Sequence, residues 1–394
     1  MSELAKLAFE GKIVLPDGLL ENGLVIVKGE RIVYVGERIP LDGHYEVKKV
    51  HGYLWPGLID IHVHGSGGAD VLDDAEEALP QMARSLLRFG VTGFLPTTMS
   101  VAKPVLAKAV STIVRSASRI HDGAEVLGIH LEGPWLSPHY MGAQNPSYLA
   151  APSETEAEWA VNTCQGMLKL VTLAPESSGA LEAIRVFAKN KVVVALGHAG
   201  ATWVQVETAV EAGASHVTHI FNAMRGLHHR EPGMAGAALA EDRLSVELIA
   251  DGLHVHPAII KLLTRVKTPD QLLLISDGIS AVGMQDGEYQ LGGLPIVVRE
   301  GQAALKNGTL AGSLLTLNKA VFNMISFTNI PLWQAVRMAS LAPAKKLGIA
   351  NEYGSIENGK KANLVVVDEA ARVEMVYREG KQLYRRSAYE ENSC

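Results

Sequence analysis

The stretch that decides the fold is Pro56-Gly57-Leu58-Ile59-Asp60-Ile61-His62-Val63-His64-Gly65. Its apolar run predicts a buried strand that begins after Pro56-Gly57 and ends at Gly65. Because side chains alternate between the two faces of a strand, His62 and His64 project from the same side. Two imidazole nitrogens placed in this way are suited to bind a divalent metal ion. The stretch therefore predicts a metal site at a strand end, although two exposed histidines would give the same short pattern.

Seven further apolar runs follow through the middle of the chain, and helical patterns separate several of them. The patterns over 75–89, 105–120 and 180–188 carry an apolar stripe at helical spacing. Alternating strands and helices are typical of a parallel sheet, and eight strands predict a (β/α)8 TIM-like barrel. An open doubly wound sheet is the alternative, but no Gly-x-Gly-x-x-Gly loop follows the first strand. The predicted strands span 57–61, 91–96, 126–131, 169–173, 192–196, 216–220, 246–250 and 272–275.

Both ends of the chain have the pattern of short strands separated by turns. Short segments of this kind cannot bury a core alone, so we expect the two ends to pair into one small β-sandwich domain. Two separate flaps on the central domain are the alternative. The predicted boundaries are 1–54 and 355–394 for the two parts of the sandwich and 55–354 for the barrel. A β-rich insertion is predicted over 282–305, with helices over 314–327 and 332–347.

The composition is that of a globular protein with a sizeable core, since 47% of the 394 residues are hydrophobic and 20% are charged. A net charge of -6 argues against a nucleic-acid or membrane partner. The two cysteines, Cys164 and Cys394, provide no disulfide framework, which favours a reducing, cytoplasmic location. No secretory signal pattern is found at the N-terminus, and no apolar run approaches the roughly 20 residues that span a bilayer.

Metal-ligating side chains recur at the ends of the predicted strands, where barrels of this type place their reactive groups. Taken singly, each of these residues would more often be structural, but their joint placement at one rim predicts a catalytic site. Imidazole nitrogens and a carboxylate suit zinc or iron, and a bridging carboxylate can hold two ions close together. We assign Glu132, His198 and His219 to one ion, and His62 and His64 to a second ion, with Glu132 as the bridge.

A metal ion in such a site lowers the pKa of a bound water to roughly 7, which provides a nucleophile at neutral pH. Asp277 ends the eighth predicted strand and could take the proton from that water and later give it to a leaving amine. Zinc and iron are the first expectations for the metal, and manganese or cobalt would accept the same ligands. The residues thus predict a metal-dependent hydrolase.

An ordered series of motifs carries a specific resemblance. Together they resemble the amidohydrolase superfamily and, within it, the N-acetylglucosamine-6-phosphate deacetylase family. The matching stretches, in chain order, are PGLIDIHVHG (56–65), GIHLEGP (128–134), LGH (196–198), THIFNAM (218–224), REPG (230–233), IADGLH (249–254), SDG (276–278) and TLAGS (309–313). Each motif is modest alone, and the specificity comes from their order across most of the barrel.

The resemblance implies hydrolysis of the acetamide of N-acetyl-D-glucosamine 6-phosphate, with Asp277 as general base and acid. It also implies a homodimer in which Arg230 reaches the phosphate bound in the neighbouring subunit. The other implied substrate contacts are Ala143, Gln144, Asn222, Ala223, His254, Leu310, Ala311 and Gly312. Several points stay open at this stage: one metal ion or two, and whether a metal, His254 or Gln144 polarises the carbonyl. Another amide, such as an N-acyl amino acid or a cyclic amide, is the alternative substrate, and a catalytically silent scaffold is a third hypothesis.

Overall fold

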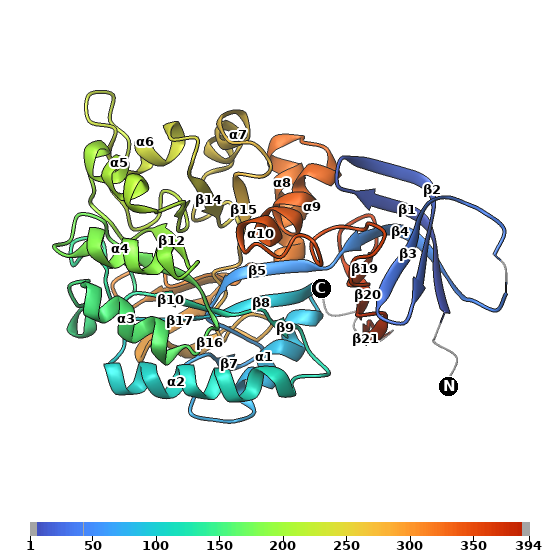
Figure 1. The fold of residues 1–394 in the computed structure, drawn as a ribbon, viewed down its shortest axis with the longest axis horizontal. Helices are drawn as coiled ribbons and strands as arrows, with labels where there is room; N and C mark the ends of the chain where they lie inside the picture. Colours follow the sequence, from blue (N-terminus) through green and yellow to red (C-terminus); the bar gives the residue numbers. More distant parts are fainter. Residues whose placement is uncertain (1–5, 42, 388–394) are drawn as a thin grey trace.

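Eight parallel strands surround the centre of the barrel within residues 6–41 and 43–387, which this computed structural model describes (Figure 1). The two ends of the row meet, because Val63 pairs with Gly278 just after the last strand and the His64 N–H donates to the Gly278 carbonyl at 2.8 Å. The predicted (β/α)8 barrel is thereby confirmed. In hydrogen-bonded order the strands are β5 (Leu58–Val63), β8 (Val91–Thr98), β10 (Ile129–Glu132), β11 (Leu168–Leu173), β12 (Val193–Leu196), β13 (His216–Val217), β14 (Ser245–Leu248) and β15 (Leu272–Leu274), and the short β9 (Glu125–Val126) pairs with β8.

The sixth barrel strand is shorter than the predicted 216–220, because the backbone leaves the extended conformation directly after Val217. His219, Phe221 and Ala223 all have positive φ angles, of 23°, 75° and 48°. Such angles are uncommon outside glycine and often mark functional sites. The irregular segment after β13 therefore turns several side chains towards the mouth of the barrel.

The helices of the barrel follow most of its strands and pack an apolar stripe on them. In α1, for example, Ala78, Met82 and Leu86 are buried. The predicted helix over 332–347 is two helices, because the backbone breaks at Ser340 (φ -139°, ψ -74°). The described helices are α1 (Ala78–Leu87), α2 (Lys103–Ser116), α3 (Glu154–Thr163), α4 (Ala180–Lys189), α5 (Trp203–Ala212), α6 (Gly233–Ala240), α7 (Pro257–Val266), α8 (Leu317–Thr328), α9 (Leu332–Met338) and α10 (Leu341–Lys346), with 3-10 turns at η1 (Ala117–Arg119) and η2 (Pro146–Tyr148).

The two chain ends form one seven-stranded sheet within the described residues, as the predicted pairing of the ends requires (Figure 1). The join lies between β4 and β19, where Leu364 pairs with Pro56. The rings of Phe9 and Tyr377 meet edge to face, 4.9 Å apart, in the core of this sheet. Its β4 lies outside the strands that the sequence predicts for the N-terminal end, which span 7–15, 23–28 and 30–36. The order is β21 (Lys381–Arg385), β20 (Val373–Arg378), β19 (Leu364–Val367), β4 (Glu46–Pro56), β1 (Lys6–Leu15), β2 (Gly18–Lys28) and β3 (Arg31–Glu37).

A three-stranded antiparallel sheet follows the last barrel strand, where the sequence predicts a β-rich insertion. It packs Ile296, Val298 and Ala303 against Ile279 and Met99 beside the mouth of the barrel. The insertion therefore contributes one wall of the space above the strand ends. Its strands are β16 (Gly287–Leu291), β17 (Leu294–Arg299) and β18 (Gln302–Leu305), and a small hairpin of β6 (Gly65–Ser66) and β7 (Ala69–Asp70) follows β5.

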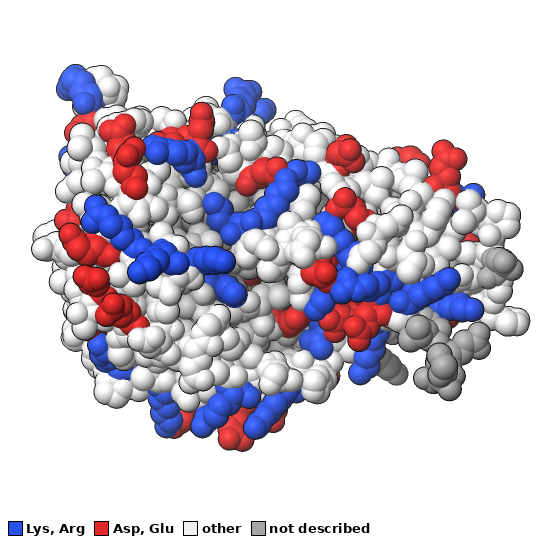
Figure 2. Space-filling model, viewed as in Figure 1, with Lys and Arg blue, Asp and Glu red and all other residues white. Residues whose placement is uncertain are grey.

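The outer surface mixes charges of both signs. On the face drawn in Figure 2, basic and acidic side chains are interspersed over the barrel and the sheet of the chain ends. Among the helices of the described residues, none has the length and apolar character that crossing a membrane requires.

Candidate metal centre and substrate cavity

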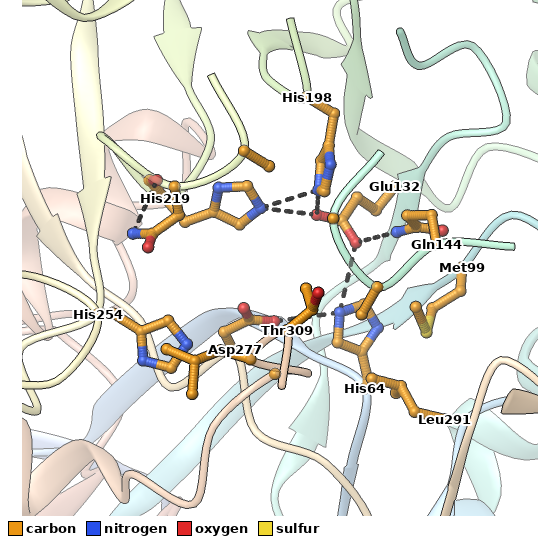
Figure 3. A pocket seen from close by; sticks show the side chains of 16 residues that line it. His64, Met99, Glu132, Gln144, His198, His219, His254, Asp277, Leu291 and Thr309 are labelled. Atoms are coloured by element: carbon orange, nitrogen blue, oxygen red, sulfur yellow. Dashed lines mark hydrogen bonds and ion pairs between the residues drawn. The ribbon is translucent and has the colours of Figure 1, made fainter. Parts of the chain in front are cut away.

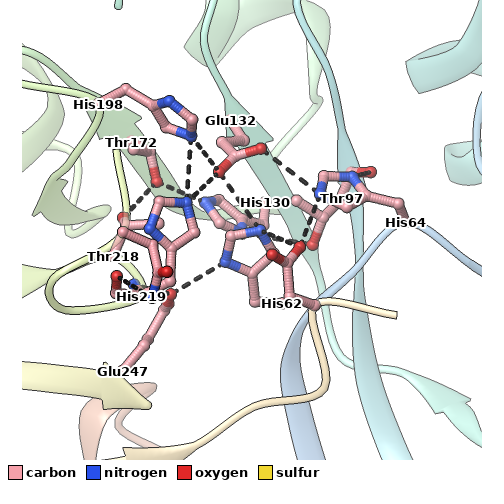
Figure 4. Close-up of polar contacts among 12 residues, drawn as sticks. His62, His64, Thr97, His130, Glu132, Thr172, His198, Thr218, His219 and Glu247 are labelled. Carbon is pink, nitrogen blue, oxygen red and sulfur yellow. Dashed lines mark hydrogen bonds and ion pairs between the residues drawn. The ribbon is translucent and has the colours of Figure 1, made fainter. Parts of the chain in front are cut away.

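Five predicted metal ligands come together at the carboxyl ends of the barrel strands (Figure 4), and Asp277 lies beside them (Figure 3). All six side chains are buried. The strand ends that carry them are far apart in the sequence, and the closed barrel brings them to one rim. His62 and His64 lie at the end of β5, Glu132 ends β10, His198 and His219 follow β12 and β13, and Asp277 follows β15.

Glu132 lies at the centre of this cluster. Its Oε1 atom is 3.1 Å from Nε2 of both His198 and His219, and these two nitrogens are 3.1 Å from each other. The same Oε1 is 3.5 Å from Nε2 of His62, whereas Oε2 is 3.4 Å from Nε2 of His64. One carboxylate thus faces two sets of histidine ligands, and within each set the ligand atoms lie within 4.8 Å of one another.

The outer ring nitrogens of three histidines hold them in the orientation that a metal requires. Nδ1 of His64 donates to the Thr97 carbonyl at 3.0 Å, and Nδ1 of His198 donates to the Tyr140 carbonyl at 2.9 Å. Nδ1 of His62 contacts Oε2 of Glu247 at 2.9 Å. Because a partner holds each Nδ1 in this way, each Nε2 points into the cluster, where a metal ion could replace its proton. Nε2 of His62 is buried and has no hydrogen-bond partner among the described residues, as expected of a ligand atom.

Charge in the cluster favours a cation. Burial by itself raises the pKa of Glu132, but His62, His198 and His219 outweigh it, and the pKa lies well below its ordinary value. For His62, burial lowers the pKa, but the charges of Glu132, Glu247 and Asp277 outweigh it and raise the pKa well above its usual range. A buried set of carboxylates that attracts protons so strongly also attracts a divalent metal ion. The donor set and its charge therefore fit a metal centre.

Asp277 lies beside the His62 and His64 ligand pair. Its Oδ1 atom is 3.1 Å from Nε2 of His64 and 3.4 Å from Nε2 of His62. Its backbone has a φ of 49° and is held on both sides, by the His62 carbonyl at 2.9 Å and the Ser313 N–H at 2.8 Å. Burial would raise the pKa of Asp277, but His62 and His64 outweigh it and keep the pKa below its ordinary value. The carboxylate is therefore ionised at neutral pH and able to accept a proton.

A cavity of about 360 Å³ opens above the cluster (Figure 3). It is lined by His64, Glu132, His198, His219 and Asp277 from the cluster. Seven of the predicted substrate contacts also line it, namely Ala143, Gln144, Asn222, Ala223, His254, Leu310 and Gly312. Two predicted contacts do not: Ala311 is fully buried in the core of the insertion, and Arg230 is exposed on the loop before α6. The cavity also has a wall of Met99 and Leu291 that the sequence did not predict.

Both ends of the Gln144 amide are engaged by the protein. Its Nε2 donates to Oε2 of Glu132 at 2.7 Å, and its Oε1 accepts the Ser100 N–H at 2.7 Å. The amide is therefore placed to orient Glu132. Of the three groups left open for polarising the carbonyl, Gln144 is the one already occupied by other partners.

His254 faces the cavity with a carboxylate behind it. Its Nδ1 is 2.6 Å from Oδ2 of Asp251, and Oδ1 of Asp251 accepts the His254 N–H at 2.8 Å. Burial lowers the pKa of His254, but the hydrogen bond and charge of Asp251 outweigh it and raise the pKa above its ordinary value. A histidine held in this way can present a donor, or a positive charge, to an anionic group in the cavity.

Glu247 is the main residue of the site that the sequence reasoning missed. It lies on β14, fully buried, and its Oε2 contacts both Nδ1 of His62 at 2.9 Å and the His219 N–H at 3.1 Å. Its Oε1 is 3.3 Å from Nε2 of His216. A glutamate inside an apolar strand is rarely buried without a partner. The position of Glu247 within the predicted strand 246–250 was therefore the signal in the sequence that it pairs with another polar group.

A buried network beneath the cluster was also missed. The His130 ring lies edge-on to His62, with centroids 4.7 Å apart. Its Nδ1 is 3.3 Å from Oγ1 of Thr97, and its Nε2 is 2.8 Å from Oγ1 of Thr172. Burial lowers the pKa of His130 well below its ordinary value, so this ring is neutral and packs against His62 while Thr97 and Thr172 hold its two nitrogens.

Comparisons with known proteins agree with this geometry. Residues 53–383 match the model of the Amidohydrolase family. The N-acetylgalactosamine-6-phosphate deacetylase of Escherichia coli O157:H7 is 41% identical over 83% of this chain and 87% of its own length, and the N-acetylglucosamine-6-phosphate deacetylase of Vibrio furnissii is 40% identical over 84% and 83%. The crystal structure of N-acetyl-D-glucosamine-6-phosphate deacetylase from Mycobacterium smegmatis superposes with a TM-score of 0.90, at 33% identity over 96% of this chain and all of that one. The chain belongs to the amidohydrolase family.

Proposed function

We propose that this chain hydrolyses the acetamide of N-acetyl-D-glucosamine 6-phosphate to D-glucosamine 6-phosphate and acetate. The observation that carries the proposal is the ionised Asp277 beside two histidine–carboxylate ligand sets at the floor of a substrate-sized cavity. The names of relatives at 40% and 41% identity, which are hexosamine-phosphate deacetylases, point to the same substrate class.

The amidohydrolase family is metal-dependent, and the chain has two ligand clusters that could hold a metal ion. In our proposal Glu132, His198 and His219 hold one ion, and His62 and His64 hold a second with Glu132 shared. Zinc or iron are the first candidates, and manganese or cobalt suit the same donors. A divalent ion bound there supplies Lewis acidity that activates water and polarises a carbonyl.

The chain's own residues would move one proton and orient the reactants. Asp277 takes a proton from the attacking water while the water oxygen forms a bond to the amide carbon. Asp277 then delivers that proton to the sugar nitrogen as the carbon–nitrogen bond breaks, which releases the amine and acetate. Gln144 holds Glu132 in place, and Glu247 holds His62. With Gln144 engaged, His254 and a bound metal are the remaining candidates for polarising the carbonyl.

The phosphosugar would lie towards Asn222, Ala223 and His254, while Ala143, Leu310 and Gly312 shape the cavity around the reacting group. A raised pKa at His254 favours the charged imidazolium, which suits a phosphate. Arg230 lies outside the cavity of its own chain, and this placement supports its action across a homodimer. We also propose a cytoplasmic location, which the buried free thiol of Cys164 supports.

The test is acetate release from N-acetylglucosamine 6-phosphate, N-acetylgalactosamine 6-phosphate and unphosphorylated N-acetylglucosamine, with metal content determined on the same sample. Preference for the first substrate supports the proposal. Preference for the galactose epimer would keep the reaction and change the sugar, as the name of one relative suggests. Equal turnover of the phosphorylated and unphosphorylated sugars, or no turnover in metal-loaded protein, would reject the proposal. Either result would favour an N-acyl amino acid or a cyclic amide as the substrate.

A further inference from the structure

The substrate cavity has one polar end and one apolar wall. His254 lies at the polar end, and Met99 and Leu291 form the wall on the other side of the metal cluster (Figure 3). Asn222, which also lines the cavity, donates to the His219 carbonyl. Met99 is 4% exposed and Leu291 is 2% exposed, so both side chains are held firmly in the packed core of the insertion.

A second cavity, of about 350 Å³, lies on the far side of this wall. In three pairs of residues that are near neighbours in the sequence, one member lines the first cavity and the other lines the second. Met99, Gln144 and Leu291 line the first cavity, whereas Val101, Asn145 and Gly292 line the second. A Cβ built on Gly292 would lie 3.1 Å from the Met99 sulfur, so the Met99 side chain rests against the Gly292 backbone. The partition between the cavities is therefore about one side chain thick.

The second cavity is about as polar as it is apolar, because the amides of Asn145 and Gln290 line it together with apolar side chains. Leu72, Val101, Ala102, Val105 and Tyr148 line it, beside the carboxylates of Asp70 and Asp73. The apolar part of its lining would suit an alkyl chain that passed through the partition.

Amide geometry sets the direction in which the acyl group points, if the proposed function holds. In the proposed reaction the carbonyl carbon would lie beside Asp277, and the sugar on its nitrogen would extend towards His254 and Asn222. The acyl chain leaves the opposite side of the carbonyl carbon and would therefore face Met99 and Leu291. We propose that Met99, with Leu291, is the specificity-determining wall that limits the acyl group to acetyl, and that the second cavity is a closed-off site for longer acyl chains.

The experiment compares kcat/KM for the N-butanoyl and N-acetyl forms of glucosamine 6-phosphate in the metal-loaded wild type and in Met99→Ala. We expect Met99→Ala to raise the butanoyl-to-acetyl ratio by about tenfold or more, since removing a steric block restores the binding of two methylenes. Leu291→Ala opens the same wall from the insertion and repeats the measurement in case Met99→Ala does not fold.

A matched double variant tests whether the second cavity receives the chain. Ala102 lines only that cavity, so Ala102→Phe should fill it without changing acetyl turnover. In Met99→Ala/Ala102→Phe the gain for the butanoyl substrate should disappear. If the butanoyl-to-acetyl ratio is unchanged in folded Met99→Ala and Leu291→Ala, these residues do not limit the acyl group. If the gain survives in the double variant, the second cavity does not receive the acyl chain.

The same data separate this inference from the proposed function. Absence of acetate release by the wild type would overturn both, whereas acetate release with an unchanged ratio overturns this inference alone.

Discussion

At the scale of single residues, the chemistry depends on a few buried side chains whose charges are balanced by their neighbours. Asp277 stays ionised because His62 and His64 lie 3.4 and 3.1 Å away. A histidine ligand can present Nε2 because a partner holds its Nδ1. The residues that bind and the residues that orient them are therefore separate, and mutations should separate their effects.

Asp277→Asn is expected to lower kcat by about 100-fold or more, because an amide of the same shape cannot take a proton from water. The metal content and the thermal unfolding temperature should stay close to those of the wild type. The measurement is acetate release together with elemental analysis of the same preparation. Unchanged turnover in the variant would remove Asp277 from the reaction.

Glu247→Gln is expected to weaken metal binding on the His62 side by about 10- to 100-fold, because a neutral amide supports the imidazole less well than a carboxylate. Zinc titration calorimetry and elemental analysis after dialysis would measure the loss. Asp60→Asn is the matched control, since Asp60 is also buried but accepts the backbone N–H of His62, at 3.3 Å, and not the ring. Equal losses in the two variants would mean that burial of charge, and not the orientation of His62, explains the effect.

At the scale of elements, hydrogen bonds connect helices and strands at the amino ends of the barrel strands, opposite the site, as well as at the mouth of the barrel. Lys346, the last residue of α10, donates from Nζ to the Ser215 carbonyl, at 3.0 Å, just before β13. Burial lowers the pKa of Lys346 to about 8. The charged form is thus less favourable in the folded state than in the unfolded state.

This shift predicts a pH dependence of stability. Between about pH 8 and the unfolded value near 10.5, the unfolded chain binds more protons, so the free energy of unfolding should rise with pH. The gain across that window is on the order of 1 kcal/mol, because the amine is partly solvated. Urea unfolding of the wild type and of Lys346→Met at pH 7.5, 8.5 and 9.5 would test it. The variant should lack this contribution to the slope, and parallel slopes in the two proteins would contradict the assignment.

At the scale of the whole molecule, the position of Arg230 suggests that one chain does not complete its own site. Arg230 is exposed, its Nη1 is 2.7 Å from Nε2 of His229, and it does not line the cavity of its own chain. In the proposed function, the guanidinium that contacts the phosphate would therefore come from a second copy of the chain.

A complementation experiment tests this arrangement. Arg230→Ala and Asp277→Asn homodimers should each have low activity towards the phosphosugar. After the two are unfolded and refolded together, activity should recover to roughly a quarter of the wild-type level, because half of the dimers are mixed and each mixed dimer has one intact site. Sedimentation analysis would confirm the dimers. No recovery in a mixture shown to contain mixed dimers would mean that Arg230 does not act across the interface.

Most of the barrel, and the placement of the candidate metal ligands at its strand ends, could be predicted because their signals are local. Strand periodicity places His62 and His64 on one face, and the short apolar runs of the barrel each end at a turn or at a polar ligand. The strand β4 was missed, because the half-buried Lys48, the exposed Lys49 and a glycine interrupt its pattern. The early end of β13 was missed as well, because the positive φ angles at His219 and Phe221 come from the packing of the site and not from propensity.

The sequence by itself determined the barrel, the strand ends that carry the ligands and the family resemblance, since each depends on residues close together in the chain. Only the tertiary structure decided how those ligands are oriented. Glu247 contacts His62 from 185 positions away, and Gln144 is engaged by Glu132 and Ser100. The Met99 wall likewise depends on an insertion that folds back onto the barrel mouth. Such contacts form only when the barrel closes, because closure brings distant segments within hydrogen-bonding and van der Waals range.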